Sequence, residues 1–115
     1  MKLKLNAVLT EQIFERNKKK YMKFKVDGEK IREIHDARKH FLTKPNIDDP
    51  LDGDILTVKV PFRYNRIMCS TGDKFIYDFQ KDGPVIADMT FCGTWEKGQS
   101  CGYAWKLDGL YMGGE

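Results

Sequence analysis

The sequence predicts a mainly β domain with one helix, folded as a small five-stranded Greek-key barrel. Several short segments alternate apolar and polar residues, as strands do, and only one segment repeats its apolar residues every three or four positions. Fourteen aromatic residues and ten glycines are also typical of a β-rich fold with many turns. At 115 residues, the chain is expected to form a single domain, 1–115, with its own core.

The first two strands are expected to pair as a hairpin. Apolar and polar residues alternate from Leu3 to Leu9, and the strand is expected to run on to Phe14, the alternative being a short helical turn near 10–12. A second strand is expected at 21–26. The polar segment 15–20 between them predicts a basic connecting loop.

The second strand has two different faces. One face carries Tyr21, Lys23 and Lys25, and the other carries Met22, Phe24 and Val26. An aromatic ring flanked by cations can hold a nucleic-acid strand through stacking and phosphate contacts. The same pattern also fits an exposed edge strand whose lysines prevent aggregation.

One helix is expected at 29–42, followed by a loop. The apolar residues of this segment recur at helical spacing and are Ile31, Ile34, Ala37, Phe41 and Leu42. Asp27 is expected to cap the start of the helix, and Pro45 to prevent its continuation. Prolines and aspartates predict a loop at 45–54.

The remaining strands are expected in the second half of the chain. Segment 56–64 has the strongest alternation, with Pro61 predicting an edge, a bulge or a bend. Another strand is expected at 74–79. The last hairpin is expected to pair 85–92 with 101–107 through a connection at 93–100, and the tail 110–115 to finish the last strand.

Charge is distributed unevenly along the chain. The formal net charge is +3, but residues 1–44 carry +7 and residues 45–115 carry −4. Such a polarised domain can present one positive region that attracts a polyanion. The alternative is that both kinds of charge simply cover a solvated surface.

The cysteines and the start of the chain favour an intracellular location. Cys69, Cys92 and Cys101 lack Cys-x-x-Cys spacing and are expected to be mostly buried thiols in a reducing compartment. Zinc is not favoured, because His35 and His40 would point to different sides of a helix. The charged and alternating start is unlike a signal peptide, and we expect no membrane association.

The motifs of common enzymes are missing from the sequence, so we expect no catalytic activity and no cofactor. It has no G-x-S-x-G, P-loop or H-E-x-x-H motif. Cys69 has no histidine close by in sequence to activate it. Asp48, Asp49, Asp52 and Asp54 could bind a hard cation, but a solvated turn is the favoured interpretation, so no metal is expected.

The end of the chain resembles the closing hairpin of OB-fold single-stranded-DNA-binding proteins from viruses and phages. The similar segments are Val85–Phe91 and Gly102–Leu107, together with the basic strand 21–26. The resemblance implies an OB-fold and a role in viral or phage DNA replication or recombination. The expected helix lies before the third strand, whereas this family usually has it between the third and fourth.

The favoured function is sequence-tolerant binding of single-stranded nucleic acid, with DNA preferred over RNA. The candidate binding residues are Lys18, Lys19, Lys20, Tyr21, Lys23, Lys25, Lys59, Arg63, Arg66, Tyr77 and Trp95. Four other rings are expected in the core, namely Phe62, Phe91, Tyr103 and Trp105. Self-association or a replication-protein partner stays open. The alternative function is a small protein-interaction module that uses a β edge or the helix surface.

Overall fold

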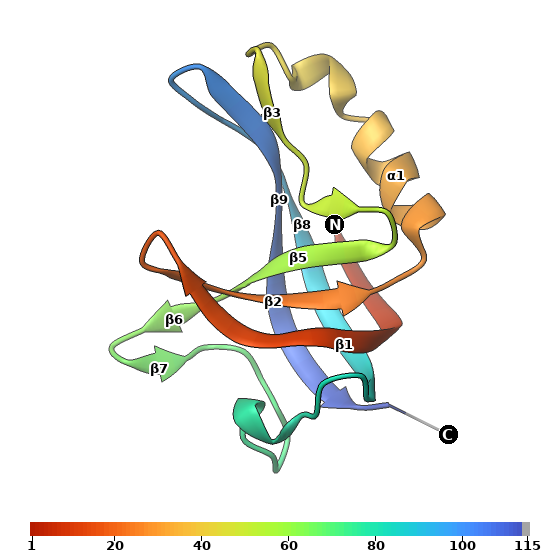
Figure 1. Ribbon diagram of the computed structural model, residues 1–115, viewed down its shortest axis with the longest axis vertical. Helices are drawn as coiled ribbons and strands as arrows, with labels where there is room; N and C mark the ends of the chain where they lie inside the picture. Colours follow the sequence, from red (N-terminus) through yellow and green to blue (C-terminus); the bar gives the residue numbers. More distant parts are fainter. Residues whose placement is uncertain (114–115) are drawn as a thin grey trace.

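The computed structural model describes residues 1–113 and confirms a mainly β fold, with 58% strand and one α-helix (Figure 1). The long strands are β1 (Lys2–Arg16), β2 (Lys19–Lys25), β5 (Ile55–Val60), β8 (Pro84–Lys97) and β9 (Ser100–Met112). The short strands are β3 (Asn46–Asp48), β4 (Leu51–Asp52), β6 (Phe62–Arg63) and β7 (Arg66–Ile67). Helix α1 covers Gly28–Asp36, and two 3-10 turns cover Lys39–Phe41 (η1) and Ile76–Asp78 (η2).

The five long strands form a partly closed ring with Greek-key topology. β8, β1, β2 and β5 lie in that order and pair antiparallel, and β8 returns through a long connection to lie beside β1. β9 pairs with β8 as a hairpin. A parallel bridge between Lys59 of β5 and Lys106 of β9 closes the ring, which confirms the predicted barrel-like fold.

The core lies inside this ring, and β2 shows how the sequence builds it. Met22, Phe24 and Val26 are buried, as their alternation predicts. The expected burial of Phe91, Tyr103 and Trp105 is also confirmed. The prediction for Phe62 is wrong, since this side chain is 42% exposed. β5 ends before Pro61, and β6 and β7 form a separate two-stranded sheet.

The β1–β2 hairpin is tighter than the sequence suggests. Its turn consists of Asn17 and Lys18 alone, both with positive φ, so the strands include most of the expected loop. β1 also contains register shifts between Leu9 and Glu11 and between Glu11 and Phe14. These bulges change which residues of the strand face outward.

Helix α1 is shorter than the predicted 29–42. It ends at Asp36, and Ala37 and Phe41 are exposed rather than packed on the core. The chain instead turns toward the β8–β9 hairpin, where the side chains of Thr43 and Lys44 contact Glu96. Asp27 occupies the N-cap position, but its side chain makes no capping hydrogen bond.

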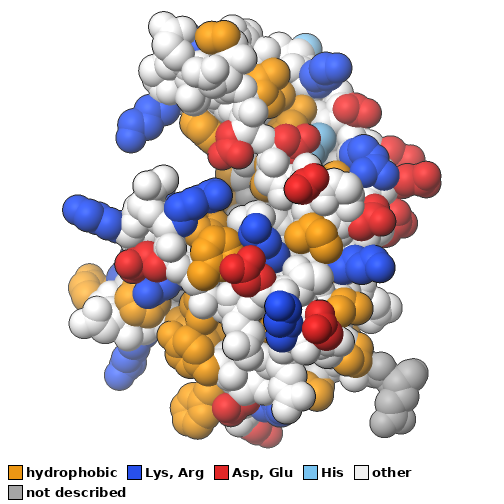
Figure 2. Space-filling view, viewed as in Figure 1, with side chains coloured by type: hydrophobic (Ala, Val, Ile, Leu, Met, Phe, Trp, Pro, Cys, Tyr) orange, Lys and Arg blue, Asp and Glu red, His pale blue; other side chains and the backbone are white. Residues whose placement is uncertain are grey.

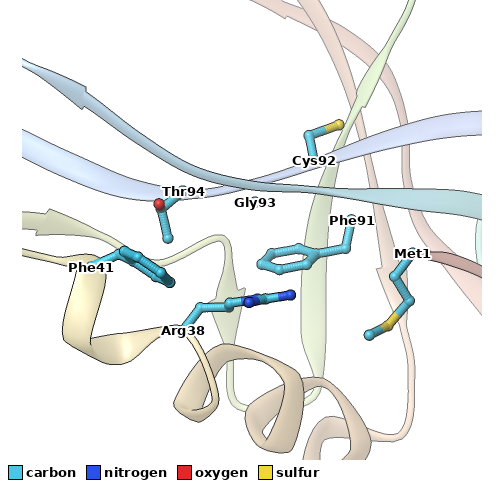
Figure 3. Close-up of a pocket in the computed structure, with 7 residues that line it drawn as sticks. All are labelled: Met1, Arg38, Phe41, Phe91, Cys92, Gly93 and Thr94. Carbon is cyan, nitrogen blue, oxygen red and sulfur yellow. The ribbon is translucent and has the colours of Figure 1, made fainter.

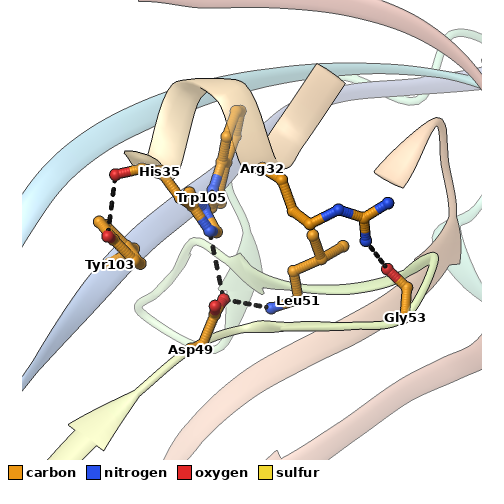
Figure 4. A network of polar contacts seen from close by, with 7 residues as sticks. All are labelled: Arg32, His35, Asp49, Leu51, Gly53, Tyr103 and Trp105. Atoms are coloured by element: carbon orange, nitrogen blue, oxygen red, sulfur yellow. Dashed lines mark hydrogen bonds and ion pairs between the residues drawn. The ribbon is translucent and has the colours of Figure 1, made fainter. Parts of the chain in front are cut away.

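A buried histidine joins α1 to β9 (Figure 4). The indole Nε1 of Trp105 donates to Nε2 of His35 at 2.9 Å, and the hydroxyl of Tyr103 donates to the His35 carbonyl at 2.8 Å. The rings of His35 and Tyr103 stack with centroids 4.0 Å apart. Nδ1 of His35 faces Oδ1 of Asp49 at 3.2 Å. Ile31, one turn earlier in α1, is fully buried in the core.

Three segments after the helix differ from their predictions. The expected loop 45–54 contains β3, which pairs parallel with β9, and β4, which pairs with β5. The expected strand 74–79 is η2 instead, because Ile76 and Phe79 enter the core at a spacing of three residues. The expected connection 93–100 is mostly strand, since β8 and β9 continue to a turn at Gly98 and Gln99.

The last strand, β9, ends at Met112. The expected extension of the last strand is confirmed as far as Met112, Gly113 lies outside the strand, and residues 114–115 of that prediction are outside the described residues. No helix in the described range 1–113 is long and apolar enough to span a bilayer.

Candidate nucleic-acid interface

The outer faces of β2, β5 and β9 form one continuous basic surface. Because the alternate residues of these strands fill the core, Tyr21, Lys23 and Lys25 of β2 face outward. Lys59 of β5 pairs with Tyr21 on one side and with Lys106 of β9 on the other. We call these five residues the basic face. Four of them are among the residues predicted from sequence, and Lys106 is an addition that the barrel closure supplies.

Cations lie opposite cations at three places on or beside the basic face. The paired residues are Arg16 with Lys19, Lys59 with Lys106, and Arg63 with Arg66. Like charges directly opposite each other on neighbouring strands destabilise a sheet. Three such pairs therefore favour a surface that complements a polyanion.

An aromatic pair lies at the edge of the basic face. Phe14 of β1 lies opposite Tyr21 of β2, with ring centroids 5.9 Å apart. The guanidinium of Arg16 lies 5.1 Å from the centroid of Tyr21, and the ammonium of Lys23 lies 5.7 Å from that of Phe14. Phe14 and Arg16 are additions to the sequence-based candidates, because alternation alone does not show which β1 residues lie beside Tyr21.

A short hairpin, the β6–β7 finger (62–67), extends from the end of β5. Its turn is formed by Tyr64 and Asn65, both with positive φ, and Tyr64 is 89% exposed. A bulky residue in this left-handed conformation is uncommon and strained. Arg63 and Arg66 flank the turn, and the ammonium of Lys20 lies 5.4 Å from the ring centroid of Phe62. The finger thus places an exposed ring between two arginines beside the β1–β2 hairpin.

Only some of the basic side chains near this surface are neutralised by acids. Lys20 pairs with Glu15 at 3.3 Å, Lys23 with Glu11 at 3.6 Å, and Lys106 with Asp108 at 3.7 Å. Seven others make no ion pair with any residue of 1–113, namely Arg16, Lys18, Lys19, Lys25, Lys59, Arg63 and Arg66. In Figure 2 several Lys and Arg side chains lie on the left, where the β1–β2 and β6–β7 hairpins project in Figure 1, and others lie in the centre and on the right, where most of the Asp and Glu side chains also lie.

Trp95 lies within β8 and not in a connecting loop, so its predicted location is wrong. It pairs with Gly102 of β9, and a Cβ at Gly102 would come within 3.0 Å of the indole Nε1. Gly102 therefore allows the half-buried indole to pack across the hairpin. Gly102 lies on the same outer side of β9 as Lys106 but four residues away, so Trp95 is not part of the basic face.

Tyr77 is not brought to the basic face. It is 63% exposed on η2, a segment packed against β1 near Gln12, whose side-chain amide donates to the carbonyl of Phe79. The structure therefore places the basic candidates and Tyr21 on or beside the basic face and leaves Trp95 and Tyr77 apart from them.

The cysteines and carboxylates do not form a site within the described residues. Burial raises the pKa of Cys69 to about 11, which keeps its thiol protonated and a poor nucleophile. Cys101 is buried, but Cys92 is exposed, contrary to the expectation of mostly buried thiols. Asp49 accepts a hydrogen bond from the Leu51 N–H at 2.9 Å. Residues 1–113 contain no group of three or more His, Cys, Asp or Glu side chains that could hold a metal.

Comparison with known proteins identifies no relative of this chain. No protein-family model matches it, and no curated protein or solved structure matches it either. The barrel and its basic surface are therefore the features from which a function can be inferred.

Proposed function

We propose that this protein binds single-stranded nucleic acid, DNA in preference to RNA, across the basic face and the β6–β7 finger. The observation that carries the proposal is the set of three cross-strand cation pairs, Arg16 with Lys19, Lys59 with Lys106, and Arg63 with Arg66. Bound phosphates would relieve the repulsion within each pair, because an anion can contact both cations.

The rings explain why a single strand is the favoured form. Tyr21 and Tyr64 present ring surface beside cations, and a flat ring can stack only on a base that has left its own stack. Base stacking on an aromatic side chain contributes about 1–3 kcal/mol and tolerates any base. The binding is therefore proposed to be tolerant of sequence.

The cellular setting is proposed from the resemblance of the closing hairpin. Viral or phage proteins with such hairpins protect single strands in replication or recombination, and the basic surface fits that task. The three free cysteines fit a reducing, intracellular environment.

Fluorescence anisotropy with labelled oligo-dT is the direct test, with salt titration and with duplex DNA and single-stranded RNA as competitors. We expect tight binding that duplex competes for poorly and RNA competes for less well than DNA. The logarithm of affinity should fall with the logarithm of salt concentration by about 0.7 per phosphate contacted. Affinity that does not respond to salt would exclude the proposal.

Charge reversals locate the site. Lys59→Glu and Lys106→Glu should each weaken oligo-dT binding and reduce the salt slope by about one phosphate. Lys81→Glu is the matched control, since Lys81 is exposed in the turn before β8 and is not part of the basic face. Equal losses from all three variants would show general electrostatic attraction rather than a site.

A further inference from the structure

The outer part of strand β8 has a free edge. β1 pairs with β8 only as far as Thr90, and the N–H of Phe91 then donates to the carbonyl of Met1 at 2.8 Å. Beyond this point, β9 is the only strand within 1–113 that pairs with residues 92–97 of β8. An exposed edge of this kind can accept another strand.

The register shows which backbone groups are available at this edge. The two-residue turn makes Lys97 and Ser100 a hydrogen-bonded pair, and such pairs alternate along an antiparallel hairpin. Thr94 and Glu96 are therefore the positions at which the N–H and C=O of β8 point away from β9. An added strand could bond to these two residues without disturbing the β8–β9 ladder.

A hollow of about 350 Å³ lies beside the start of this edge (Figure 3). Its lining includes the apolar side chains of Met1, Phe41 and Phe91, with Arg38 and Thr94. In Figure 3 the Arg38 guanidinium lies next to the Phe91 ring, and Phe41 points toward Thr94. Phe41 remains 50% exposed. The hollow can therefore hold a large apolar side chain next to a cation.

The charges around the hollow favour an acidic ligand. Arg38 makes no ion pair with another residue in the described part of the chain. Glu96, the acid on the edge itself, is engaged by Lys44 at 3.4 Å and by the Thr43 hydroxyl at 3.2 Å. Lys97 is exposed at the end of the same edge.

We propose that this edge and hollow bind an extended acidic segment of a partner protein, which adds as a strand beside β8. Its backbone would pair with Thr94 and Glu96, and a large apolar side chain would fill the hollow. Because side chains two residues apart share a face, an acidic residue two positions from the apolar one would face Arg38. This site uses none of the residues of the basic face and is independent of the proposed nucleic-acid binding.

Charge also argues against a second copy of the chain as the occupant. Two copies joined at this edge would bring a second Arg38 and a second Lys97 to the same strip of surface. An acidic partner would neutralise these cations, whereas a second copy would add to them.

Peptides selected from a random display library on the intact protein test this site. Enriched peptides, synthesised with a fluorescent label, should carry an acidic residue two positions from a large apolar one. Thr94→Pro removes an N–H that the β8–β9 ladder does not use, and Arg38→Glu reverses the charge. Each variant should weaken peptide binding about tenfold, which is the loss expected when one hydrogen bond or one strong ion pair is removed. Lys81→Glu should leave peptide binding unchanged, and all three variants should keep their affinity for oligo-dT.

Several outcomes would overturn the proposal. These are enrichment of no peptide, enrichment of basic peptides, or binding that Arg38→Glu leaves intact. A dimer in sedimentation that Thr94→Pro dissociates would identify a second copy as the occupant. Should Thr94→Pro fail to fold, hydrogen exchange on the unmodified protein replaces it, and the bound peptide must then slow exchange at the Thr94 and Glu96 amides.

Discussion

Two regions of this molecule, the α1–β9 contact and the basic face, are both built from rings and basic groups. They differ in that the groups of the contact are paired with one another, whereas cations of the basic face lie opposite cations. In the contact, Trp105 and Tyr103 each donate a hydrogen bond to His35, and the rings of His35 and Tyr103 stack. On the basic face, Lys59 lies opposite Lys106, and rings stay partly exposed. The contact is arranged to stabilise the fold, whereas the basic face retains repulsion that a ligand could relieve.

The neighbouring residues Trp105 and Lys106 test this contrast most strongly, because they belong to opposite sides of β9. Trp105→Ala should lower the free energy of unfolding by about 3–5 kcal/mol through the cavity it leaves. Lys106→Ala should change it by no more than about 0.5 kcal/mol, as a surface substitution that also removes a like-charge pair. Urea denaturation measures both changes.

For oligo-dT binding, we expect the opposite order, with Lys106 more important than Trp105. Lys106→Ala should weaken binding although the variant is stable, because one phosphate contact is lost. Trp105→Phe, which retains most of the packing, should bind normally. A Lys106→Ala variant that loses as much stability as Trp105→Ala would show that Lys106 supports the barrel rather than a ligand.

Tyr64 offers a second and smaller test, since its ring and its backbone have opposite effects. Tyr64→Gly should raise the free energy of unfolding by about 1 kcal/mol, because glycine adopts positive φ without strain. The same change should weaken oligo-dT binding by about 1–3 kcal/mol if a base stacks on the ring. Thermal denaturation and anisotropy measure the two effects.

The control for this variant is Tyr64→Ala. Alanine removes the ring but keeps the Cβ that strains the turn, so affinity should fall without the gain in stability. If both variants bind oligo-dT as the unmodified protein does, the finger plays no part in binding.

The sequence predicts the parts of this molecule that depend on local alternation. The two faces of β2 follow from a spacing of two residues, so Met22 and Phe24 could be assigned to the core and Lys23 to the surface. The break at Pro61 could be predicted as well, because proline cannot donate to a ladder. These predictions needed no knowledge of distant neighbours.

The parts that depend on distant pairing could not be predicted in this way. Lys106 joins the basic face only because β9 closes on β5, and Phe14 lies opposite Tyr21 only because two register shifts in β1 set that pairing. The connection predicted at 93–100 places Trp95 in a loop, but β8 continues through it to Lys97 and the turn is formed by Gly98 and Gln99. The local sequence pattern thus predicts which residues supply the positive charge, but not the strand pairings that bring these residues together.

The smallest effect expected is a pH dependence that arises at the α1–β9 contact. The indole of Trp105 can only donate, so Nε2 of His35 must accept and the proton of the neutral ring lies on Nδ1, facing Asp49. Burial lowers the pKa of His35 from its ordinary value of 6.5, although the carboxylates of Asp49 and Asp36 act in the opposite direction. At a pH between the lowered pKa and 6.5, His35 is therefore protonated in the unfolded chain and neutral in the folded protein.

This stabilising contribution is complete above the unfolded pKa and declines as pH falls toward the folded one. The free energy of unfolding should thus decrease from about pH 7.5 to about pH 5.5, and His35→Gln should flatten that part of the profile. Asp49→Asn should steepen it, because it removes a charge that favours the protonated ring while an amide oxygen can still accept from the Leu51 N–H. Urea denaturation between about pH 7.5 and about pH 5.5 measures this free energy of unfolding. If it rises on acidification, the effect of Asp49 on the pKa outweighs that of burial, and His35 is charged in the folded protein.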